Sequence, residues 1–351
     1  MIDELARSPT DVARTELVPS AADNSSIGLA ASWYAVALAD EVGEQPVAVQ
    51  VLGTAWVLVR LDEQLVAFED RCPHRLAPLS IGCVRGTALE CGYHGWRFDA
   101  SGRCVAIPSL GDEAILPPRA ALRPPAGVVE RYGLVWIAPE RPVCDLPSFP
   151  EWDDPAYDRM WNEPRRTTAG ALQLCENFLD ATHIPTVHRS TFGVVEAPHL
   201  PPHTVEQNGW QASTTYEITY RNHDDPLVET GEHPLEQPQL LYKEVCPATT
   251  ALIRLEFPLT GKTIAILFCC LPESPTSTRI FKMMARNDFD GDDERIADSI
   301  AFEDRVLDED LAVLEAYRHT SVPLDLLTEV HTRNDRLPIA YRRLLARLLD
   351  Q

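Results

Sequence analysis

Residues 177–188 read Asn-Phe-Leu-Asp-Ala-Thr-His-Ile-Pro-Thr-Val-His, and this stretch guides the interpretation of the remaining chain. Asn177, Asp180 and His183 are three residues apart, so in a helix they would share one polar face. Pro185 cannot continue a helix, so we expect the chain to turn there and to bring His188 back toward His183. Two imidazoles from one segment, with a carboxylate from elsewhere, form the two-His-one-carboxylate set that holds ferrous iron and leaves coordination positions open. Surface or helix-capping histidines would be the simpler explanation of this stretch taken alone.

A second motif lies upstream and pairs a cysteine with a histidine twice. Cys72-Pro-His74 and Cys91-Gly-Tyr-His94 are separated by sixteen residues. Two cysteines on one iron and two histidines on the other are the ligands of a Rieske [2Fe–2S] cluster. The alternative is a structural zinc site with the same four ligands. Zinc sites more often pair Cys with Cys and His with His, whereas both halves here are mixed, so the pattern favours the iron–sulfur cluster.

Composition indicates a globular protein. The chain has 351 residues, of which 45% are hydrophobic and 24% charged, and this length allows two domains. Its longest apolar run, near residues 263–271, is too short to span a bilayer. A net charge of −22 argues against nucleic acid or an anionic membrane as partner. Nine thinly spread cysteines, and an N-terminus without a signal pattern, predict a reducing, cytoplasmic location.

Turn signals and apolar periodicity divide the chain into three parts. Residues 1–28 are polar and aperiodic, and we expect a mobile tail. Residues 29–150 alternate short β-type runs with turns and end in a proline-rich linker, which predicts a small antiparallel β domain. Residues 151–351 hold the histidine segment, five further strand-like runs and two late helices. The predicted strands are 47–52, 55–61, 65–69, 87–91, 134–138, 210–220, 240–246, 250–258, 263–271 and 279–286, and the predicted late helices are 292–319 and 338–349.

The two Cys/His halves and the histidine segment together resemble the Rieske non-heme iron oxygenases. The likeness covers nearly the whole chain, from about residue 33 to the C-terminus. The family pattern implies that Cys72 and Cys91 bind one iron of the cluster and that His74 and His94 bind the other.

The same resemblance implies roles for the histidine segment. His183 and His188 would bind the mononuclear iron. Asp180 matches the family acid that links the iron site to a cluster histidine of the neighbouring subunit, and Asn177 matches the asparagine beside the iron. Electron transfer between subunits requires a ring, and we expect a homotrimer.

The third iron ligand should be an acid on the late helix, within residues 306–316. Three acids are adjacent there: Asp308, Glu309 and Asp310. We expect Asp310 to be the ligand, because the run resembles the Glu-Glu-Asp stretch of single-subunit members such as dicamba monooxygenase and the saxitoxin-pathway hydroxylases, in which the last acid binds iron. Asp308 and Glu309 fit an exposed acidic helix face better.

The resemblance also implies a fold, cofactors and partners. The fold would be α+β, with a Rieske antiparallel β domain followed by a helix-grip (START-like) catalytic domain whose curved antiparallel sheet surrounds a long helix. The cofactors would be a Rieske [2Fe–2S] cluster and a mononuclear Fe(II), with O2 as co-substrate. No GxGxxG or GxxxxGK[ST] motif occurs, so we expect electrons from a separate ferredoxin or flavin reductase.

The predicted activity is that of a monooxygenase that hydroxylates a small apolar organic molecule. If the oxidised carbon is an O- or N-methyl, the outcome is demethylation. One alternative is a cis-dihydroxylating aromatic ring dioxygenase, although the large subunits of those enzymes are usually longer. A non-catalytic Rieske electron carrier would need no second iron site, and a zinc-organised binding module is the remaining option.

Two local features carry further expectations. Gly92 stands where the family usually has proline, and because glycine tolerates most backbone shapes we expect an intact cluster in a looser loop. Residues 222–239 are acidic and proline-containing and form a candidate loop and lid. Candidates for the walls of an apolar cavity beside the iron are Leu172, Phe178, Phe192, Val194 and residues on the inward strand faces around Tyr242 and Phe257.

Overall fold

The computed structural model describes residues 20–111, 115–223 and 225–350. The predicted tail falls partly outside this range, because residues 1–19 are not described. For residues 20–28 the prediction of a mobile tail is wrong. Strand β1 (Ala21–Ala22) pairs with β20 (Val322–Pro323), and a short 3-10 helix, η1 (Ile27–Ala31), follows. The buried side chain of Asn24 accepts a hydrogen bond from the Ala171 amide and donates to the Ser274 carbonyl, which attaches this segment to the body.

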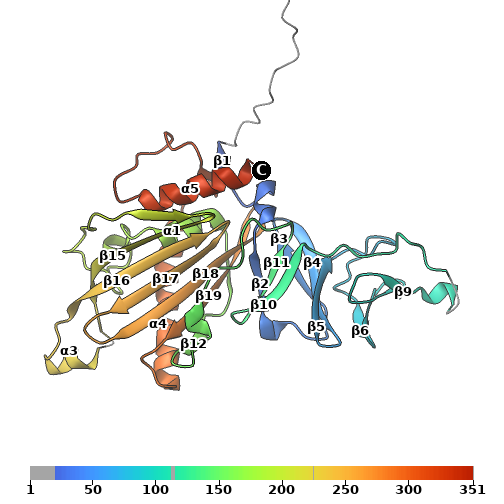
Figure 1. Cartoon of the computed structure of the whole chain (residues 1–351), viewed down its shortest axis with the longest axis horizontal. Coiled ribbons are helices and arrows are strands. Elements are labelled where there is room, and N and C mark those ends of the chain that lie inside the picture. The colour runs from blue at the N-terminus through green and yellow to red at the C-terminus, as the bar shows by residue number, and fades with distance from the viewer. Residues whose placement is uncertain (1–19, 112–114, 224, 351) are drawn as a thin grey trace, which may run out of the picture.

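Three small antiparallel sheets form the N-terminal part. One joins β3 (Val47–Val51), β4 (Thr54–Leu61) and β5 (Gln64–Glu69), and a second joins β10 (Gly127–Arg131), β11 (Leu134–Ala138) and β2 (Tyr34–Leu38). The third projects as a narrow arm on the right of Figure 1 and contains β6 (Cys83–Arg85), β7 (Ala88–Glu90), β8 (Arg97–Phe98) and β9 (Cys104–Ala106). The five strands predicted for this part are present. Several others, including β6 and β8, span two or three residues, which is too short to show periodicity.

An eight-stranded antiparallel sheet dominates the C-terminal part. Its order is β12 (Asp158–Trp161), β19 (Ser277–Arg286), β18 (Lys262–Ser274), β17 (Thr250–Phe257), β16 (Glu236–Cys246), β15 (Gln211–Arg221) and β14 (Val205–Asn208), with β13 (Arg165–Thr167) also paired to β19. All five predicted strands are present in this sheet, and the last two, β18 and β19, pair as an antiparallel hairpin. The candidate loop at 222–239 is more ordered than predicted, since it holds α3 (Pro226–Thr230) and the start of β16.

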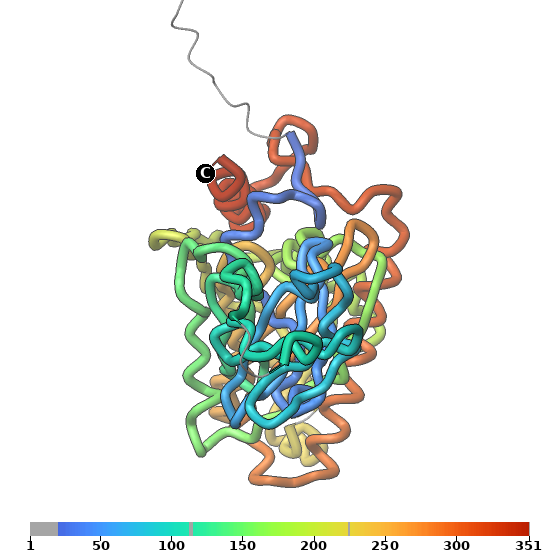
Figure 2. Tube along the Cα trace, turned by 90° about the vertical axis from the view of Figure 1, so that its right-hand side faces the viewer, coloured from blue at the N-terminus to red at the C-terminus, as the bar shows by residue number. Residues whose placement is uncertain are grey.

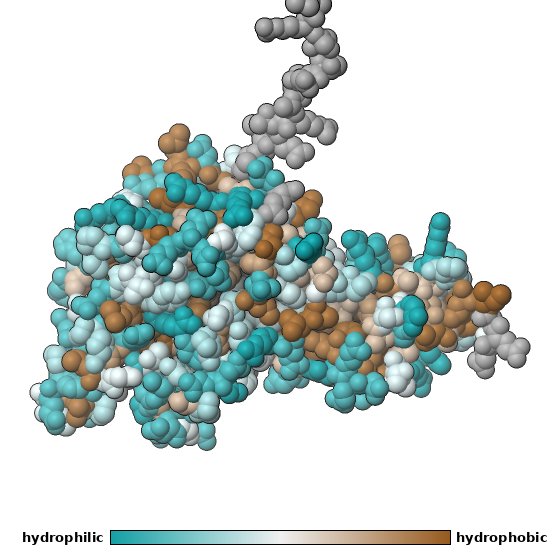
Figure 3. All heavy atoms as spheres, in the orientation of Figure 1, coloured by the Kyte–Doolittle hydropathy of each residue, from teal (hydrophilic) through white to brown (hydrophobic). Residues whose placement is uncertain are grey.

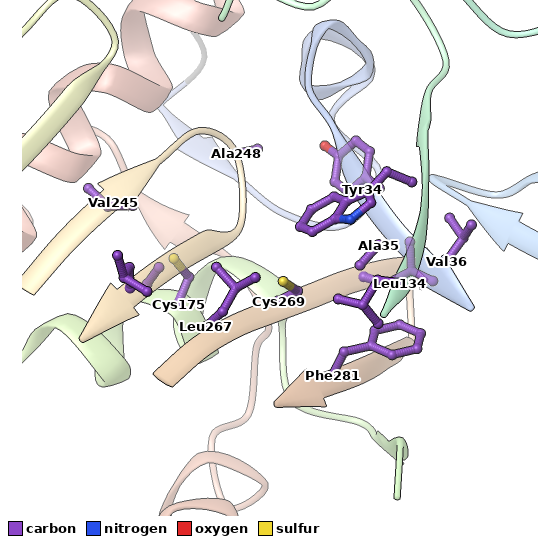
Figure 4. Close-up of a cluster of buried hydrophobic side chains, with 14 of the residues drawn as sticks. Tyr34, Ala35, Val36, Leu134, Cys175, Val245, Ala248, Leu267, Cys269 and Phe281 are labelled. Atoms are coloured by element: carbon purple, nitrogen blue, oxygen red, sulfur yellow. The ribbon is translucent and has the colours of Figure 1, made fainter. Parts of the chain in front are cut away.

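Strand β18 explains how one sheet joins the two parts of the molecule. Side chains alternate faces along a strand, and both faces of β18 are buried, so its sequence reads as a continuous apolar run. Leu267 and Cys269 belong to a core shared with Tyr34 and Leu134 of the N-terminal sheets (Figure 4). On the opposite face, Phe268 and its even-numbered neighbours pack toward helix α4 and the cavity described below.

The long helix α4 (Asp293–Leu314) lies against this inner face of the sheet (Figure 1). It begins after Asp292, whose side chain accepts hydrogen bonds from the Glu294 and Arg295 amides as an N-cap. The helix ends at Leu314, five residues before the end of the predicted helix 292–319. The last helix, α5 (Arg336–Leu349), packs beside η1 (Ile27–Ala31) at one end of the molecule (Figure 2). The remaining short 3-10 helices are η2 (Ala39–Glu41), η3 (Pro108–Leu110) and η4 (Pro150–Trp152).

The histidine segment folds differently from the expected single helix. Helix α1 (Ala171–Leu179) ends at Asp180, and a short second helix, α2 (Ile184–Val187), starts after His183. Pro185 lies in the first turn of α2, where a missing backbone N–H costs nothing, so the proline begins a helix there and does not end one. The predicted polar face is therefore bent, but His183 and His188 still face each other.

Candidate metal centres and catalytic cavity

The Cys72 and Cys91 loops at the arm have matching backbone geometry. In the first, the Cys72 amide donates to the Ala77 carbonyl and the Leu76 amide donates to the Cys72 carbonyl, both at 2.9 Å. In the second, the Cys91 amide donates to Trp96 at 2.8 Å and Gly95 donates to Cys91 at 3.0 Å. Residues 76 and 95, which are equivalent in the two loops, both have positive φ angles. The two halves of the motif are thus two copies of one loop.

These loops bring two thiols and two imidazoles together. Cys72 and Cys91 are buried in a small core with strands β4 and β5, and their side chains lie close enough to hydrogen-bond. The His74 and His94 ring centroids are 4.5 Å apart, and Trp96 stacks on His74. Burial raises the pKa of Cys72 to about 11, partly offset by the backbone N–H groups of His74 and Arg75 that bond its sulfur. Backbone donors of this kind are typical around cluster thiolates.

An unpartnered buried atom supports a cluster at these loops. Among the described residues, His74 Nδ1 is buried without any hydrogen-bond partner. A ring nitrogen in that position suits a metal ligand, because coordination satisfies its lone pair. The donor set of two thiols and two imidazoles fits a Rieske [2Fe–2S] cluster.

A second convergence of ligand atoms lies between α2 and α4. His183 Nε2 and His188 Nε2 are 3.2 Å apart, and Asp310 Oδ1 lies 3.5 and 3.3 Å from them. Within the described part of the chain, this is the group of three such side chains that could hold a metal ion. Asp310 Oδ1 is buried and lacks a hydrogen-bond donor. These three side chains fit a two-His-one-carboxylate iron site.

Carboxylates behind the histidines set the direction in which each ring points. Asp180 Oδ2 lies 3.1 Å from His183 Nδ1, and Glu309 Oε2 lies 2.9 Å from His188 Nδ1. With the proton of each neutral ring on Nδ1, both Nε2 lone pairs face the common centre. Burial would raise the Asp310 pKa, but the nearby imidazoles of His188 and His183 hold it below the ordinary value.

Glu309 was not predicted to have this role. It was expected on an exposed acidic face, but its carboxylate is mostly buried and also accepts hydrogen bonds from Ser190 Oγ at 2.5 Å and Thr191 Oγ1 at 2.8 Å. Asp308 does follow the expectation: its side chain is 60% exposed and pairs with Arg165. Ser190 and Thr191, two and three residues after His188, were the sequence signal for a buried acceptor.

Lys243 anchors the bend between α1 and α2. Its ammonium is buried and donates to the Phe178 carbonyl at 2.8 Å and to the Asp180 carbonyl at 2.5 Å. Burial lowers the Lys243 pKa to about 8, although the charges of Asp180 and Asp310 partly offset this effect. Burial would raise the pKa of Asp180 itself, but the hydrogen bond and charge of His183, the Thr182 amide and the charge of Lys243 together hold the pKa well below its ordinary value.

A mostly apolar cavity of about 110 Å³ opens beside the three convergent side chains. Asn177, His183, His188 and Asp310 lie in its wall, and strands β16, β17 and β18 with helix α4 supply much of the remainder. Of the four wall residues predicted individually, Phe178 and Phe192 line the cavity, whereas Leu172 and Val194 do not. The predicted strand faces do contribute: Leu241 and Lys243 beside Tyr242, and Leu255 near Phe257, line the cavity, while Tyr242 itself points to the opposite face of β16.

A second depression lies on the other side of Asp180. It is polar, with a volume of about 380 Å³, and Glu176, Asp180, His319 and Arg342 are among its lining residues. Burial raises the pKa of Glu176 to about 7, against the opposing effect of its ion pair with Arg342. Asp180 thus lies between the apolar cavity and this polar depression.

Comparisons with known proteins agree with both halves of this description. Residues 32–124 match the Rieske [2Fe-2S] domain, and residues 168–351 match the vanillate O-demethylase oxygenase C-terminal domain. The chain is 30% identical over 308 residues to methylxanthine N1-demethylase NdmA of Pseudomonas putida, covering 87% of this chain and 83% of that protein. It is 33% identical over 293 residues to the putative toluene-4-sulfonate monooxygenase system iron-sulfur subunit TsaM2 of Comamonas testosteroni, covering 77% and 82%.

Solved structures share the architecture. Pseudomonas putida CBB5 NdmA with caffeine superposes with a TM-score of 0.80 at 25% identity, covering 93% of this chain and 96% of that one. Dicamba monooxygenase bound to dicamba superposes with a TM-score of 0.77 at 24% identity, covering 92% and 97%, which is evidence for a common fold. No helix within the described ranges is long and apolar enough to cross a membrane.

Proposed function

This chain belongs to the Rieske non-heme iron oxygenases, and we propose that it oxidises a C–H bond of a small, largely apolar organic molecule. Members of this family use a Rieske cluster, a mononuclear iron and O2. The alternatives of an electron carrier without a second iron site and of a zinc-organised module are therefore set aside. Where the attacked carbon is an O- or N-methyl, the net reaction is demethylation, the activity named for the relative NdmA.

Cys72, His74, Cys91 and His94 are the proposed ligands of the cluster. The support is the paired loops, the stacked and adjacent rings, and the buried, unpartnered Nδ1 of His74. Exposed apolar side chains surround these loops, including Leu76, Ile81 and Tyr93, and Figure 3 shows apolar residues gathering along this arm.

His183, His188 and Asp310 are the proposed ligands of the mononuclear iron. One observation carries this proposal: both Nε2 atoms and Asp310 Oδ1 converge, while a carboxylate behind each ring keeps its proton on the other nitrogen. When bound, the cluster supplies single electrons and the iron activates O2. The chain's own contribution is to orient the rings through Asp180 and Glu309 and to exclude water with apolar walls such as Phe178.

We further propose that the cluster of one subunit serves the iron site of its neighbour in a homotrimer. The arm that carries β6 to β9 projects away from α4 (Figure 1). The polar depression beside Asp180 is suited to receive the histidine end of a neighbouring arm, with Asp180 as the connecting acid. Light scattering of the iron-loaded protein tests this arrangement, since a monomer with full turnover would contradict it.

The remaining proposals concern the domains, the electron donor and the cell compartment. We place the boundary between the Rieske and catalytic domains near residue 150, between the two matched family regions. A separate ferredoxin or flavin reductase is the proposed donor. A cytoplasmic location is supported by nine free cysteines, four of which are buried outside the cluster motif.

Turnover of a panel of methoxy, N-methyl and unsubstituted aromatic compounds tests the activity. The holoenzyme is supplied with a surrogate reductase and labelled O2, and products are identified by mass spectrometry. Incorporation of one labelled oxygen atom, or release of formaldehyde, is expected. A cis-diol carrying two labelled atoms would instead support ring dihydroxylation, and no oxygenated product from any compound would contradict the proposal.

A further inference from the structure

Charged side chains in the catalytic cavity are paired within the protein. Lys243 is bonded to two backbone carbonyls. Lys282 donates to the Glu303 carbonyl at 2.8 Å and to its carboxylate at 2.9 Å. The guanidinium of Arg286 bonds Asp288 and Ser299. An anionic substrate would therefore meet no uncommitted cation among these groups, and burying its charge there would be costly.

Gln239 is different, because its polar group is uncommitted. It lies on β16, faces the cavity with Leu241 and Lys243, and is 2% exposed. Among the described residues, its Nε2 has no hydrogen-bond partner. The neighbouring Gln237 shows the usual state of a buried glutamine, since its Nε2 donates to Asp225 at 2.7 Å and to the Pro234 carbonyl at 3.0 Å. Buried polar groups are nearly always satisfied, so an unsatisfied amide in a cavity wall points to a ligand.

Strand geometry places Gln239 at the end of the cavity away from the metal. The Lys243 ammonium touches the carbonyl of Asp180, three residues before His183. Four residues of β16 separate Lys243 from Gln239, a distance of roughly 13 Å along the strand. The cavity volume of about 110 Å³ is comparable with cavities of about 150 Å³ that bind benzene. A molecule of a single ring therefore suits the space between the metal ligands and Gln239.

We propose that Gln239 binds the substrate and that the substrate is a neutral molecule of a single ring. It carries a hydrogen-bond acceptor, such as a carbonyl oxygen or a ring nitrogen, at the end opposite the oxidised carbon. The Gln239 carboxamide donates Nε2–H to this acceptor, which fixes the orientation of the ring. This inference rests on the proposed oxygenase function and adds the chemical class of its substrate.

Three compounds of the same shape test the proposal. Para-methoxyacetophenone is neutral with an acceptor, para-isopropylanisole replaces the carbonyl by an apolar group, and para-methoxybenzoate carries a negative charge. All three present the same methoxy carbon for oxidation. Binding to the iron-loaded holoenzyme is measured by isothermal titration calorimetry in the absence of reductant, so that affinity is read without turnover.

The variant Gln239→Leu removes the donor with little change of volume. We expect it to weaken the binding of para-methoxyacetophenone by about two- to twelvefold, the range that corresponds to the loss of one neutral hydrogen bond. The binding of para-isopropylanisole should not be weakened. The control Leu255→Met changes the same cavity wall without changing its polarity and should affect both compounds alike. Gln239→Met repeats the test if the leucine variant does not retain its cluster spectrum.

Each result separates this inference from the oxygenase assignment. Equal losses for the two neutral compounds in Gln239→Leu, tightest binding by para-methoxybenzoate, or no binding by any of the three would overturn the role of Gln239. None of these results concerns oxygenation itself, which the labelled-O2 experiment on the wider panel reads independently. Failure of that experiment with the expected binding order intact would reject the activity and keep the ligand class.

Discussion

Replacement of Glu309 by glutamine should release the mononuclear iron without disturbing the Rieske cluster. The carboxylate lies 2.9 Å from His188 Nδ1 and also accepts from Ser190 and Thr191. Glutamine keeps one acceptor oxygen but presents an amide donor toward groups that are themselves donors. Loss of such an outer contact typically costs 10- to 100-fold in metal affinity, or about 1.4–2.8 kcal/mol. The ring of His188 would then no longer be held with Nε2 toward His183.

The assay is a titration of metal-stripped mononuclear sites with buffered ferrous iron, followed under anaerobic conditions. The visible spectrum of the cluster is recorded in the same samples as an internal reference. Asp308→Asn is the matched control, because this acid is the preceding residue on the helix but is 60% exposed and pairs with Arg165. An exposed pair of this kind contributes at most about 1 kcal/mol, so iron affinity should be unchanged. If Glu309→Gln binds iron as tightly as Asp308→Asn, the orienting role of Glu309 is refuted.

Two further predictions concern the cluster loop and a buried acid. A Cβ on Gly92 would lie 2.7 Å from the Ile81 carbonyl oxygen, so Gly92→Ala should displace the loop, lower the free energy of unfolding by about 1–3 kcal/mol and reduce the cluster content measured by absorbance. The control Gly43→Ala, with open space around the new Cβ, should change neither quantity. An unchanged Gly92→Ala protein would show that the loop yields freely. Burial raises the pKa of Glu176 from 4.5 to about 7, so the stability gained from its protonated form is present below pH 4.5 and lost as the pH rises toward 7. Relative to that of Glu176→Gln, the unfolding free energy of the natural protein, measured by urea titration, should fall by on the order of 3 kcal/mol over that pH interval. Glu329 is the exposed partner of the same arginine, Arg342, and the pH dependence of Glu329→Gln should be parallel to that of the natural protein. Parallel curves for Glu176→Gln would contradict the raised pKa.

Gly92 also corrects the reasoning from sequence. Glycine in place of the usual proline was expected to loosen the loop, but the backbone of Ile81 approaches so closely that a side chain at position 92 would collide with it. Residues 81 and 92 lie on different loops, and their close approach is not encoded in the local sequence of either. The small size of glycine is therefore a second relevant property at position 92, and the looser loop stays a prediction.

The elements predicted from sequence are those with strong local signals. The apolar alternation of strands β15 to β19 and the capped, periodic helix α4 follow from patterns that repeat over many residues. The bend at Asp180 does not, because it depends on Lys243, which is distant in sequence and bonds the carbonyls of Phe178 and Asp180. Without that cation the local sequence favours a helix continued to Pro185, which is the structure we had expected.

The site itself was predictable to the extent that ligand types carry chemistry. Cysteine and histidine at short, mixed spacings, and two histidines near an acid, suffice to nominate candidates. The residues around them are less accessible to such reasoning. Glu309 is distinguished from Asp308 by the side of α4 on which it lies, since it faces His188. Gln239 is distinguished from Gln237 by its Nε2, which has no hydrogen-bond partner. Both distinctions are relations across the tertiary fold.

Iron and sulfide analysis of His183→Ala tests the central claim most directly. If the cluster and the mononuclear site are separate centres, the natural protein holds about three irons and two sulfides per chain. The variant should retain about two irons, two sulfides and an unchanged cluster spectrum, and it should form no oxygenated product. A variant that keeps the third iron, or one that loses iron and sulfide together, would contradict two independent iron centres in this chain.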